Sequence, residues 1–560
     1  MRRIFSTLMS VVALTFATEA SAQVDFGGTV FNNDILGWGD MYNLSFTSHN
    51  YGTARSMAMG NAFTALGADM VSASLNPAGI GMYTSGDVNL TPMLQYTESK
   101  MKGSEPYYLG ASRGDQDFTD DTLRFGFSNF GFVFPVFRSA EAVTNINVGF
   151  VYNRIADFSH NYMGATRNQP YTNTMANLFC TLSNIDGLQT NDDGTMNFGN
   201  DPYYWGSVLA YKNGLTNKDD QGWFVDRIGE GASIDQYTAV ETRGSVGEYA
   251  MTMGMNFIDK VYFGISLGLQ TLDYRREMFY GENYNYTERP SGDVMPYQLD
   301  YMNYMQSTEY SGTGVNVKVG VTARPVDWLR VGVAYHSPTF YSVDLFYKAE
   351  MWSSTLSAGN NPDGYNVGPK GYMYDRASTG VWEDSGPYSW EFRTPSRLLV
   401  GSAVTIARRV IVSADYERSW YQTLHLMSSP IQSLNYGATM DKVFKGSDTV
   451  RVGAEGFVLP YLALRAGYIW SGNTLRDEFK DATFTHPLTT STSSITAGVG
   501  LKFSEDFYLD LAYQYNVVNY SGFKTFYATD ANNEAQSIES KSYGLSTDRH
   551  MALLTLGFRF

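Results

Sequence analysis

The sequence has a single cysteine, Cys180, in 560 residues. One cysteine cannot form an intramolecular disulfide, and no cysteine cluster is present to bind zinc. The six histidines are scattered along the chain without a helical i, i+4 pair, so we expect no metal site. We recognise no serine–histidine–aspartate set, phosphate loop or metalloprotease helix, and we therefore expect neither an enzyme nor a cofactor.

Basic residues are also scarce. The chain has 40 Lys and Arg against 56 Asp and Glu, which gives a net charge of -16. Binding to phosphates needs a basic surface, so nucleic acid is excluded as a partner. We read the negative charge as a source of solubility and of repulsion between exposed loops. An acidic turn, Asn191-Asp192-Asp193, lacks the further ligands of a calcium loop.

No apolar run after the N-terminus reaches the roughly 18 residues that a spanning helix needs, and the mean hydropathy is -0.26. The N-terminus itself combines two arginines after Met1, an apolar run over 8–16 and the small residues 20–22. This pattern predicts a secretory signal peptide over 1–22, with a mature chain that begins at Gln23. Because no cysteine follows the cleavage site, we expect no lipoprotein anchor.

Strict alternation marks the end of the chain. One face of the last segment is apolar up to the terminal residue; its members are Ala552, Leu554, Leu556, Phe558 and Phe560. The opposite face carries Leu553, Thr555, Gly557 and Arg559. Such a strand suits a barrel wall with lipid on one side and a polar lumen on the other. A soluble sandwich strand can alternate in the same way, so the number and spacing of such strands decide.

About fourteen segments show this alternation, and an even number is expected of a single-chain bacterial barrel. We predict strands near 87–97, 122–137, 145–159, 244–257, 260–280, 310–324, 327–348, 390–407, 409–425, 447–458, 461–473, 492–503, 506–522 and 548–560. Short turns and long loops alternate between them, and the first strand starts on the side of the short turns, where the last one ends. The predicted fold is all-β: a transmembrane antiparallel β-barrel, monomeric, in the outer membrane of a Gram-negative bacterium.

Two regions do not fit the barrel wall. Residues 23–86 alternate poorly and are rich in Gly, Ala, Met and Asn, so we expect a compact segment with short helical turns ahead of a barrel over 87–560. The longest expected loop, 160–243, contains aromatic clusters and Cys180. A loop of this length usually has a function, and it has room for short helices.

The N-terminal block resembles the start of the FadL/TodX-type outer-membrane transport proteins, with a Bacteroidetes-like branch closest. The resemblance lies in residues 51–69 (YGTARSMAMGNAFTALGAD) and 74–80 (SLNPAGI). Weaker similarity continues at 324–339, 394–397 and 415–417, so that nearly all of the mature chain is covered.

This resemblance implies a fourteen-stranded barrel plugged by its N-terminal segment. It implies passive uptake of hydrophobic molecules, typically long-chain fatty acids or aromatic hydrocarbons, by capture between outer loops, plug gating and lateral release at a kinked third strand. Asn76, Pro77 and Ala78 match the plug motif, and Gly149 is the candidate bend. From the residues alone, Asn76-Pro77-Ala78 is better read as an ordinary turn, and the surrounding resemblance favours the plug. The long loop at 160–243 departs from the simplest family pattern and leaves the cargo open.

Strand phase turns several basic residues inward. Lys318, Arg330, Arg451 and Arg465 are the candidates for binding a substrate carboxylate, because an arginine can hold one with two parallel hydrogen bonds. Acidic residues share the same faces, so the alternative is a lumen held together by ion pairs.

The expected partners are a fatty-acid-like hydrophobic small molecule, the outer-membrane lipids, and the barrel-assembly machinery acting on the C-terminal strand. A first rival function is a surface adhesin or receptor that uses the 160–243 loop. A second is a lipid-acting barrel enzyme, because residues 264–268 fit the G-x-S-x-G string; they lie in mid-strand, however, where the strand-to-helix elbow of a hydrolase is absent.

Overall fold

The computed structural model describes residues 38–46, 51–104, 118–139, 141–185, 187–190, 196–197, 204–228, 231–286, 297–357, 365–366, 388–428, 437–530 and 533–560. The predicted signal peptide, residues 23–37 and the acidic turn at 191–193 lie outside these ranges.

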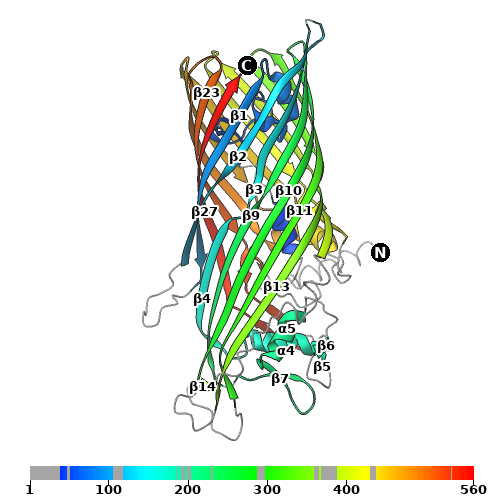
Figure 1. Ribbon diagram of the computed structural model, residues 1–560, viewed down its shortest axis with the longest axis vertical. Helices are drawn as coiled ribbons and strands as arrows, with labels where there is room; N and C mark the ends of the chain where they lie inside the picture. The colour runs from blue at the N-terminus through cyan, green and yellow to red at the C-terminus, as the bar shows by residue number, and fades with distance from the viewer. Residues whose placement is uncertain are drawn as a thin grey trace, which may run out of the picture.

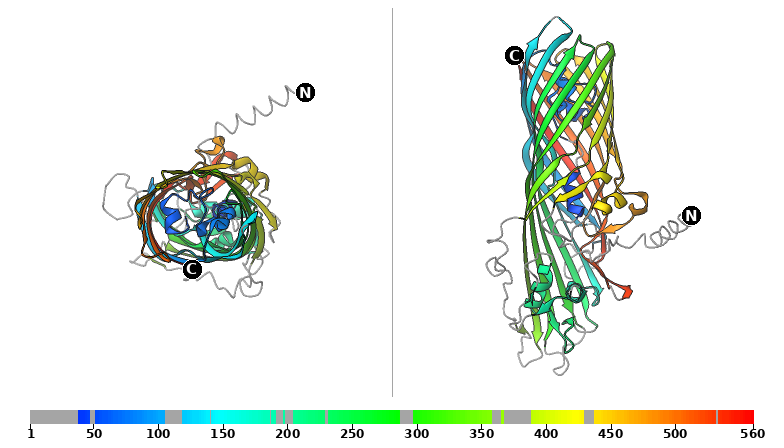
Figure 2. Two further views of the ribbon diagram at one scale, coloured as in Figure 1. Left: turned by 90° about the horizontal axis from the view of Figure 1, so that it is seen from above. Right: turned by 90° about the vertical axis from the view of Figure 1, so that its right-hand side faces the viewer.

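Fourteen antiparallel strands form a closed barrel (Figures 1 and 2). The ring closes because β27 (Ser542–Arg559) pairs with β1 (Asp87–Lys102), with Phe558 opposite Val88 and Gly544 opposite Lys102. The other members, in order around the ring, are β2 (Phe118–Arg138), β3 (Val143–Asp157), β9 (Ser233–Phe257), β10 (Val261–Asn285), β11 (Tyr297–Val326), β12 (Leu329–His336), β16 (Arg397–Ile406), β17 (Val410–Ser419), β19 (Ser447–Leu459), β20 (Leu462–Ser471), β22 (Thr489–Lys502) and β23 (Phe507–Tyr520). The predicted strand number is confirmed.

On one side the wall extends well beyond the ring, toward the bottom of Figure 1. There β4 (His160–Pro170) continues β3 along β9, and β13 (Phe340–Ser357) continues β12 along β11. The loop expected at 160–243 therefore begins and ends as barrel wall, and β10 and β11 likewise extend into the loop expected at 281–309. The two-residue apolar pattern did not mark these extensions, because a strand outside the membrane needs no apolar outer face.

The insertion between β4 and β9 folds into a small lobe at the bottom of Figure 1. It contains α4 (Met175–Ile185), α5 (Trp205–Lys212) and two short hairpins, β5–β6 (Gln189–Thr190, Met196–Asn197) and β7–β8 (Thr216–Lys218, Phe224–Asp226). Buried Glu282 of β10 fixes the start of α4, because its carboxylate accepts hydrogen bonds from the Met175 amide (2.9 Å) and from Tyr280 and Tyr284 (both 2.7 Å). The expectation of short helices in this region is confirmed.

Other short elements lie in the outer connections. They are β14 (Tyr365–Asn366), β15 (Tyr388–Arg393), η4 (Tyr421–Thr423), β18 (His425–Ser428), α8 (Gly437–Val443), η5 (Asp477–Phe479), β21 (Thr483–Phe484), β24 (Gly522–Lys524), β25 (Tyr527–Asp530) and β26 (Asn533–Glu539).

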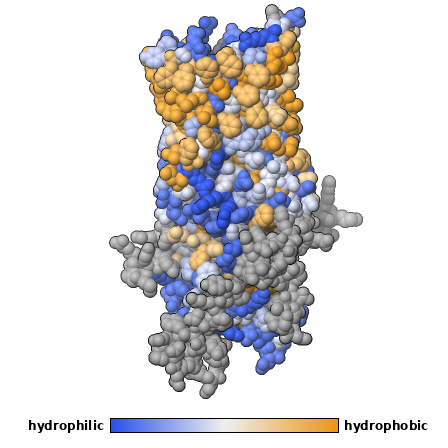
Figure 3. All heavy atoms as spheres, in the orientation of Figure 1, coloured by the Kyte–Doolittle hydropathy of each residue, from blue (hydrophilic) through white to orange (hydrophobic). Residues whose placement is uncertain are grey.

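The barrel is apolar on its outside. Over residues 263–269 of β10 and 315–321 of β11 the outward side chains are 39–49% exposed although every one is apolar; they are Phe263, Ile265, Leu267, Leu269, Val315, Val317, Val319 and Val321. Figure 3 shows the resulting apolar band at the end of the barrel where the chain ends and the short turns lie. A polar lumen inside an apolar band is the arrangement of a membrane barrel, whose short turns face the periplasm. Among the described residues, none of the helices has the length and apolar character to cross a membrane.

A charge on this band should be costly. Val319→Arg places a guanidinium among acyl chains, so we expect it to lower the free energy of unfolding in lipid vesicles by about 2–4 kcal/mol. Ser311→Arg, on the outward face of the same strand but beyond the band, is the control and should change it little. Equal effects of the two substitutions would contradict the position of the band.

Candidate functional site

The N-terminal segment lies inside the barrel, where Figure 2 shows its short helices surrounded by strands. It contains α2 (Trp38–Ser45), α3 (Ala54–Ala58), η1 (Met70–Ala73) and η2 (Pro77–Met82). All of residues 51–83 are buried except Arg55, Ala68 and Met82, which are partly exposed. Because β1 begins at Asp87, these residues occupy the periplasmic half of the bore.

Glycines of the wall make room for this segment. A side chain at Gly264 of β10 would collide with the backbone carbonyl carbon of Pro77. One at Gly320 of β11 would collide with the side-chain oxygen of Asn76. The same contact recurs around the barrel at Gly254, Gly332, Gly453 and Gly467, each of which faces backbone atoms of the segment. Glycine is required wherever two backbones approach this closely.

Polar side chains of the wall bind the backbone of the segment. Asn147 of β3 donates to the Ile80 carbonyl (2.8 Å), and Asp415 of β17 accepts from the Thr64 amide (2.8 Å). Similar bonds come from Ser128, Asn145, Arg330, Thr496 and Thr555. Irregular backbone inside a bore has little water to satisfy it, so these side chains replace the hydrogen bonds of a helix or sheet.

The Asn76-Pro77-Ala78 motif starts η2. The Asn76 side-chain oxygen accepts from the Ala78 amide (3.1 Å), while its amide group donates to the Thr64 carbonyl (2.5 Å) and to the Thr322 hydroxyl of β11 (3.1 Å). Pro77 occupies the first helical position, where its missing N–H costs nothing. One asparagine thus joins two turns of the segment to the wall.

The four predicted carboxylate-binding residues are all engaged by the protein. Lys318 lies 2.6 Å from Glu248, and both side chains are buried. Glu248 also accepts from Ser74 of the N-terminal segment (2.8 Å), so this pair connects wall and segment. Arg330 donates to the Leu66 carbonyl (2.9 Å).

The remaining two candidates are in ion pairs as well. Arg451 lies 2.6 Å from Glu417, and Arg465 lies 2.7 Å from Glu455 and 2.6 Å from Asp510. This is the arrangement that the ion-pair alternative describes. A role of these residues in substrate binding stays a prediction.

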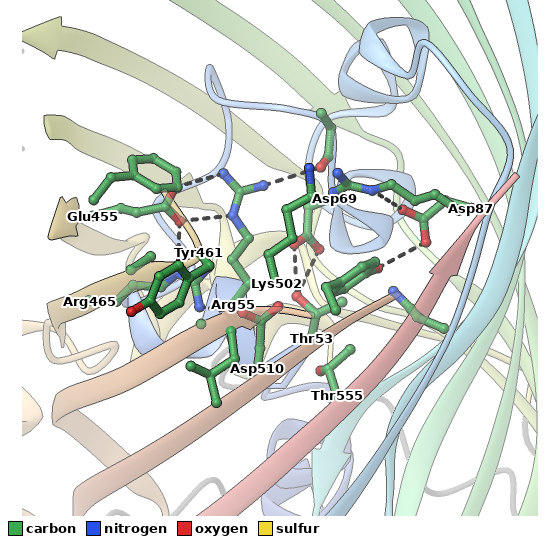
Figure 4. Close-up of a pocket in the computed structure, with 18 of the residues that line it drawn as sticks. Thr53, Arg55, Asp69, Asp87, Glu455, Tyr461, Arg465, Lys502, Asp510 and Thr555 are labelled. Carbon is green, nitrogen blue, oxygen red and sulfur yellow. Dashed lines mark hydrogen bonds and ion pairs between the residues drawn. The ribbon is translucent and has the colours of Figure 1, made fainter. Parts of the chain in front are cut away.

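Arg465 borders a cavity of about 210 Å³ between the N-terminal segment and the periplasmic end of the wall (Figure 4). Arg55 crosses it, because its guanidinium lies 3.0 Å from Glu455 of β19 and donates to the Ala68 carbonyl (3.3 Å). Thr53 donates to Asp69 (2.9 Å), whose pKa is raised by burial. Nine charged side chains lie in this lining, so the cavity suits water better than an apolar cargo.

The candidate bend at Gly149 lies in the middle of β3, where the strand is paired on both sides, with Val133 of β2 and with Thr252 of β9. The ladder between β2 and β3 ends four residues further on, at the pair Asn129–Asn153. Beyond it, residues 118–128 of β2 have no ladder partner on the β3 side in the part of the chain that the structure describes. The structure therefore places the interruption of the wall after Asn153, and a bend function of Gly149 stays a prediction.

A second cavity, of about 90 Å³, lies in the outer half of the bore behind this interruption. Its lining includes Arg276 of β10 and Arg549 of β27, which are 7% and 8% exposed, and a set of rings: Phe46, Tyr51, Phe158, Tyr162, Tyr274 and Tyr520. The sequence prediction missed both arginines. The signal was available, since Arg276 shares the inward face of Gln270 and Arg549 shares that of Leu553, but nothing in the sequence showed that the two strands enclose one cavity.

Fold and site together define a class: an outer-membrane β-barrel of fourteen strands whose own N-terminal segment occupies the bore. No protein-family model and no curated protein matches the chain.

Similar solved structures include the CymD monoaromatic hydrocarbon channel, with 12% identity over 92% of this chain and 99% of that chain and a TM-score of 0.44. The toluene transporter TodX of Pseudomonas putida has 14% identity over 92% and 100% of the two chains, with a TM-score of 0.45. A FadL homologue of Pseudomonas aeruginosa has 13% identity over 92% and 98%, with a TM-score of 0.46.

The Lys318–Glu248 pair gives a stability prediction. Lys318→Met leaves a buried carboxylate without its cation and should destabilise the protein by about 3–5 kcal/mol. The double variant Lys318→Met/Glu248→Gln removes both charges and should recover most of this loss. Equilibrium unfolding of the three proteins tests it, and a double variant as unstable as the single one would contradict the pairing.

The glycine contacts give a packing prediction. Gly264→Val forces a side chain into the backbone of Pro77, so we expect a loss of at least about 2 kcal/mol and trypsin cleavage of the displaced N-terminal segment. Gly456→Val on β19 is the control, because a side chain there meets open space. An N-terminal segment that stays protected in Gly264→Val would show that the close contact is absent.

Proposed function

We propose that this barrel is a passive uptake channel for hydrophobic small molecules, of the FadL/TodX type, with long-chain fatty acids as the expected cargo. One observation carries the proposal: the N-terminal segment lies inside the bore but contributes no strand to the wall. Its contacts are side chains that bind its backbone, together with ion pairs such as Arg55–Glu455. Such a segment can move while the ladder stays intact, which is what a gate requires.

Capture is assigned to the outer half of the barrel. The bore there is filled by a large apolar cluster rich in rings, among them Tyr280, Tyr304, Tyr347, Trp390 and Phe392. Aromatic side chains offer a large apolar surface to a cargo that water rejects. This cluster therefore favours a cargo with a large apolar part.

Release is assigned to the gap between β2 and β3. Arg154 of β3 reaches across it and donates to the Phe127 carbonyl of β2 (3.3 Å), and its guanidinium lies 2.6 Å from Asp157. Outside the gap, Leu123 and Phe125 are 63% and 71% exposed on the apolar face. A molecule that leaves the bore here enters the membrane directly and avoids the charged periplasmic cavity.

The gate is testable at Asn76. Replacing Asn76 and Pro77 by alanine removes the four side-chain hydrogen bonds of Asn76, of about 1 kcal/mol each, which favours displacement of the segment. We expect oleate uptake to rise about ten-fold, with a barrel that remains folded by its heat-dependent mobility on gels. Asn519→Ala, on the exposed face of β23, is the control. Uptake equal to that of the wild type would refute the gating role.

The adhesin alternative is tested by deletion. Because residues 160–170 and 233–243 belong to the wall, the deletion should be confined to 171–232, with a short flexible linker in their place. We expect uptake of oleate to survive, since the membrane ladder is left whole. If the variant lost host-cell binding while its oleate uptake stayed equal to that of the parent, the lobe would have a second function.

A further inference from the structure

The outer cavity is a small chamber with walls from opposite sides of the barrel. Asp40 and Phe46 of the N-terminal segment face it together with residues of β3, β4, β9, β10, β22, β23 and β27. Its volume of about 90 Å³ is several times the roughly 10–15 Å³ that one water molecule needs. The chamber therefore has room for a small organic molecule, but not for an acyl chain of the length found in membrane lipids.

The charges of the chamber do not balance. Its lining has two guanidinium groups, Arg276 and Arg549, and two carboxylates, Asp40 and Asp157. Asp157 is already 2.6 Å from Arg154, which comes from the β2–β3 gap. His160 and His486 add no charge at neutral pH, because burial lowers the pKa of each to about 4. With Arg154 included, three guanidinium groups share two carboxylates around the chamber, so a bound anion would complete the balance.

Hydrogen-bonding groups in the lining are also unused. Arg549 Nε, Thr492 Oγ1 and His486 Nε2 are buried and have no hydrogen-bond partner among the described residues. Arg549 makes one long hydrogen bond, to the Tyr51 hydroxyl at 3.4 Å. The arginine and threonine are donors that a carboxylate oxygen would satisfy. Unpaired buried donors next to an empty volume are the features of a ligand site.

Aromatic side chains line the other walls of the chamber. Phe158 and Tyr274 meet edge to face with centroids 5.4 Å apart, and His160 stacks on both Tyr162 and Tyr520 at 5.7 Å. Such walls offer ring faces and ring edges, which a flat aromatic ligand fits better than a flexible chain.

We propose that the outer cavity binds a small aromatic carboxylate, with its anionic group at Arg549 and Thr492 and its ring among Phe158, Tyr162 and Tyr520. This inference deepens the proposed function and rests on it, since it names one class of cargo that the uptake route admits. The ligand should therefore have one negative charge, one aromatic ring and about the volume of benzoate.

Isothermal titration of the purified full-length barrel in detergent, with benzoate as the probe, tests the assignment. Benzyl alcohol has the ring without the charge, and hexanoate has the charge without the ring. We expect benzoate to bind at least ten-fold more tightly than either. Arg549→Gln should weaken benzoate binding at least ten-fold, whereas Arg559→Gln, on the same inward face of β27 but at the periplasmic end, should not change it.

Benzoate binding no tighter than that of the two analogues, or unchanged in Arg549→Gln, would overturn the inference. If Arg549→Gln gives no folded barrel, Thr492→Val decides, because it keeps the shape and removes one donor; a loss of less than three-fold then counts against the site. Oleate that competes with benzoate would assign the chamber to fatty acids instead. Uptake is measured separately: oleate uptake without benzoate binding refutes this inference alone, and benzoate binding without any uptake refutes the proposed function.

Discussion

The whole structure depends on satisfying backbone hydrogen bonds where water is scarce. The wall does so by closing: β27 pairs with β1, and over the described residues each ring strand has a partner on both sides, although β2 lacks one along 118–128. The N-terminal segment inside the bore cannot join a ladder, so side chains such as Asn147 and Asp415 satisfy its backbone. Both solutions follow from the high cost of a buried N–H or C=O without a partner.

Close contact between segment and wall explains the distribution of glycine. Gly264 and Gly320 lie on the inward faces of β10 and β11, opposite Pro77 and Asn76, where any side chain would collide with the segment. Outward neighbours on the same strands are bulky and apolar, as Ile265 and Val319 are. The inward face of each strand must leave room for the segment, and the outward face must be apolar toward lipid. The strands therefore alternate glycine or polar residues with aliphatic ones.

Charge is used differently in the two halves of the bore. In the periplasmic half each predicted basic residue has an acidic or carbonyl partner, as Lys318 has in Glu248, so the charges hold the segment in place. In the outer half three guanidinium groups share two carboxylates, and Arg549 Nε, beside an open volume, has no hydrogen-bond partner among the described residues. The outer chamber thus differs from the paired charges in that its guanidinium groups lie beside a volume that a ligand could enter.

The sequence by itself determined the wall. The direction of each strand's side chains follows from covalent geometry with a period of two, so strand number, closure and the inward phase of Lys318 or Arg465 could be predicted from local pattern. The extensions of β9 to β11 beyond the membrane were not predicted, because a strand outside the membrane needs no apolar face. Only the tertiary structure decided which inward groups meet: Arg55 pairs with Glu455, 400 residues away, and Arg276 and Arg549 share one chamber although they lie on different strands. Such contacts depend on how the cylinder closes around its own N-terminal segment, and no local pattern contains that information.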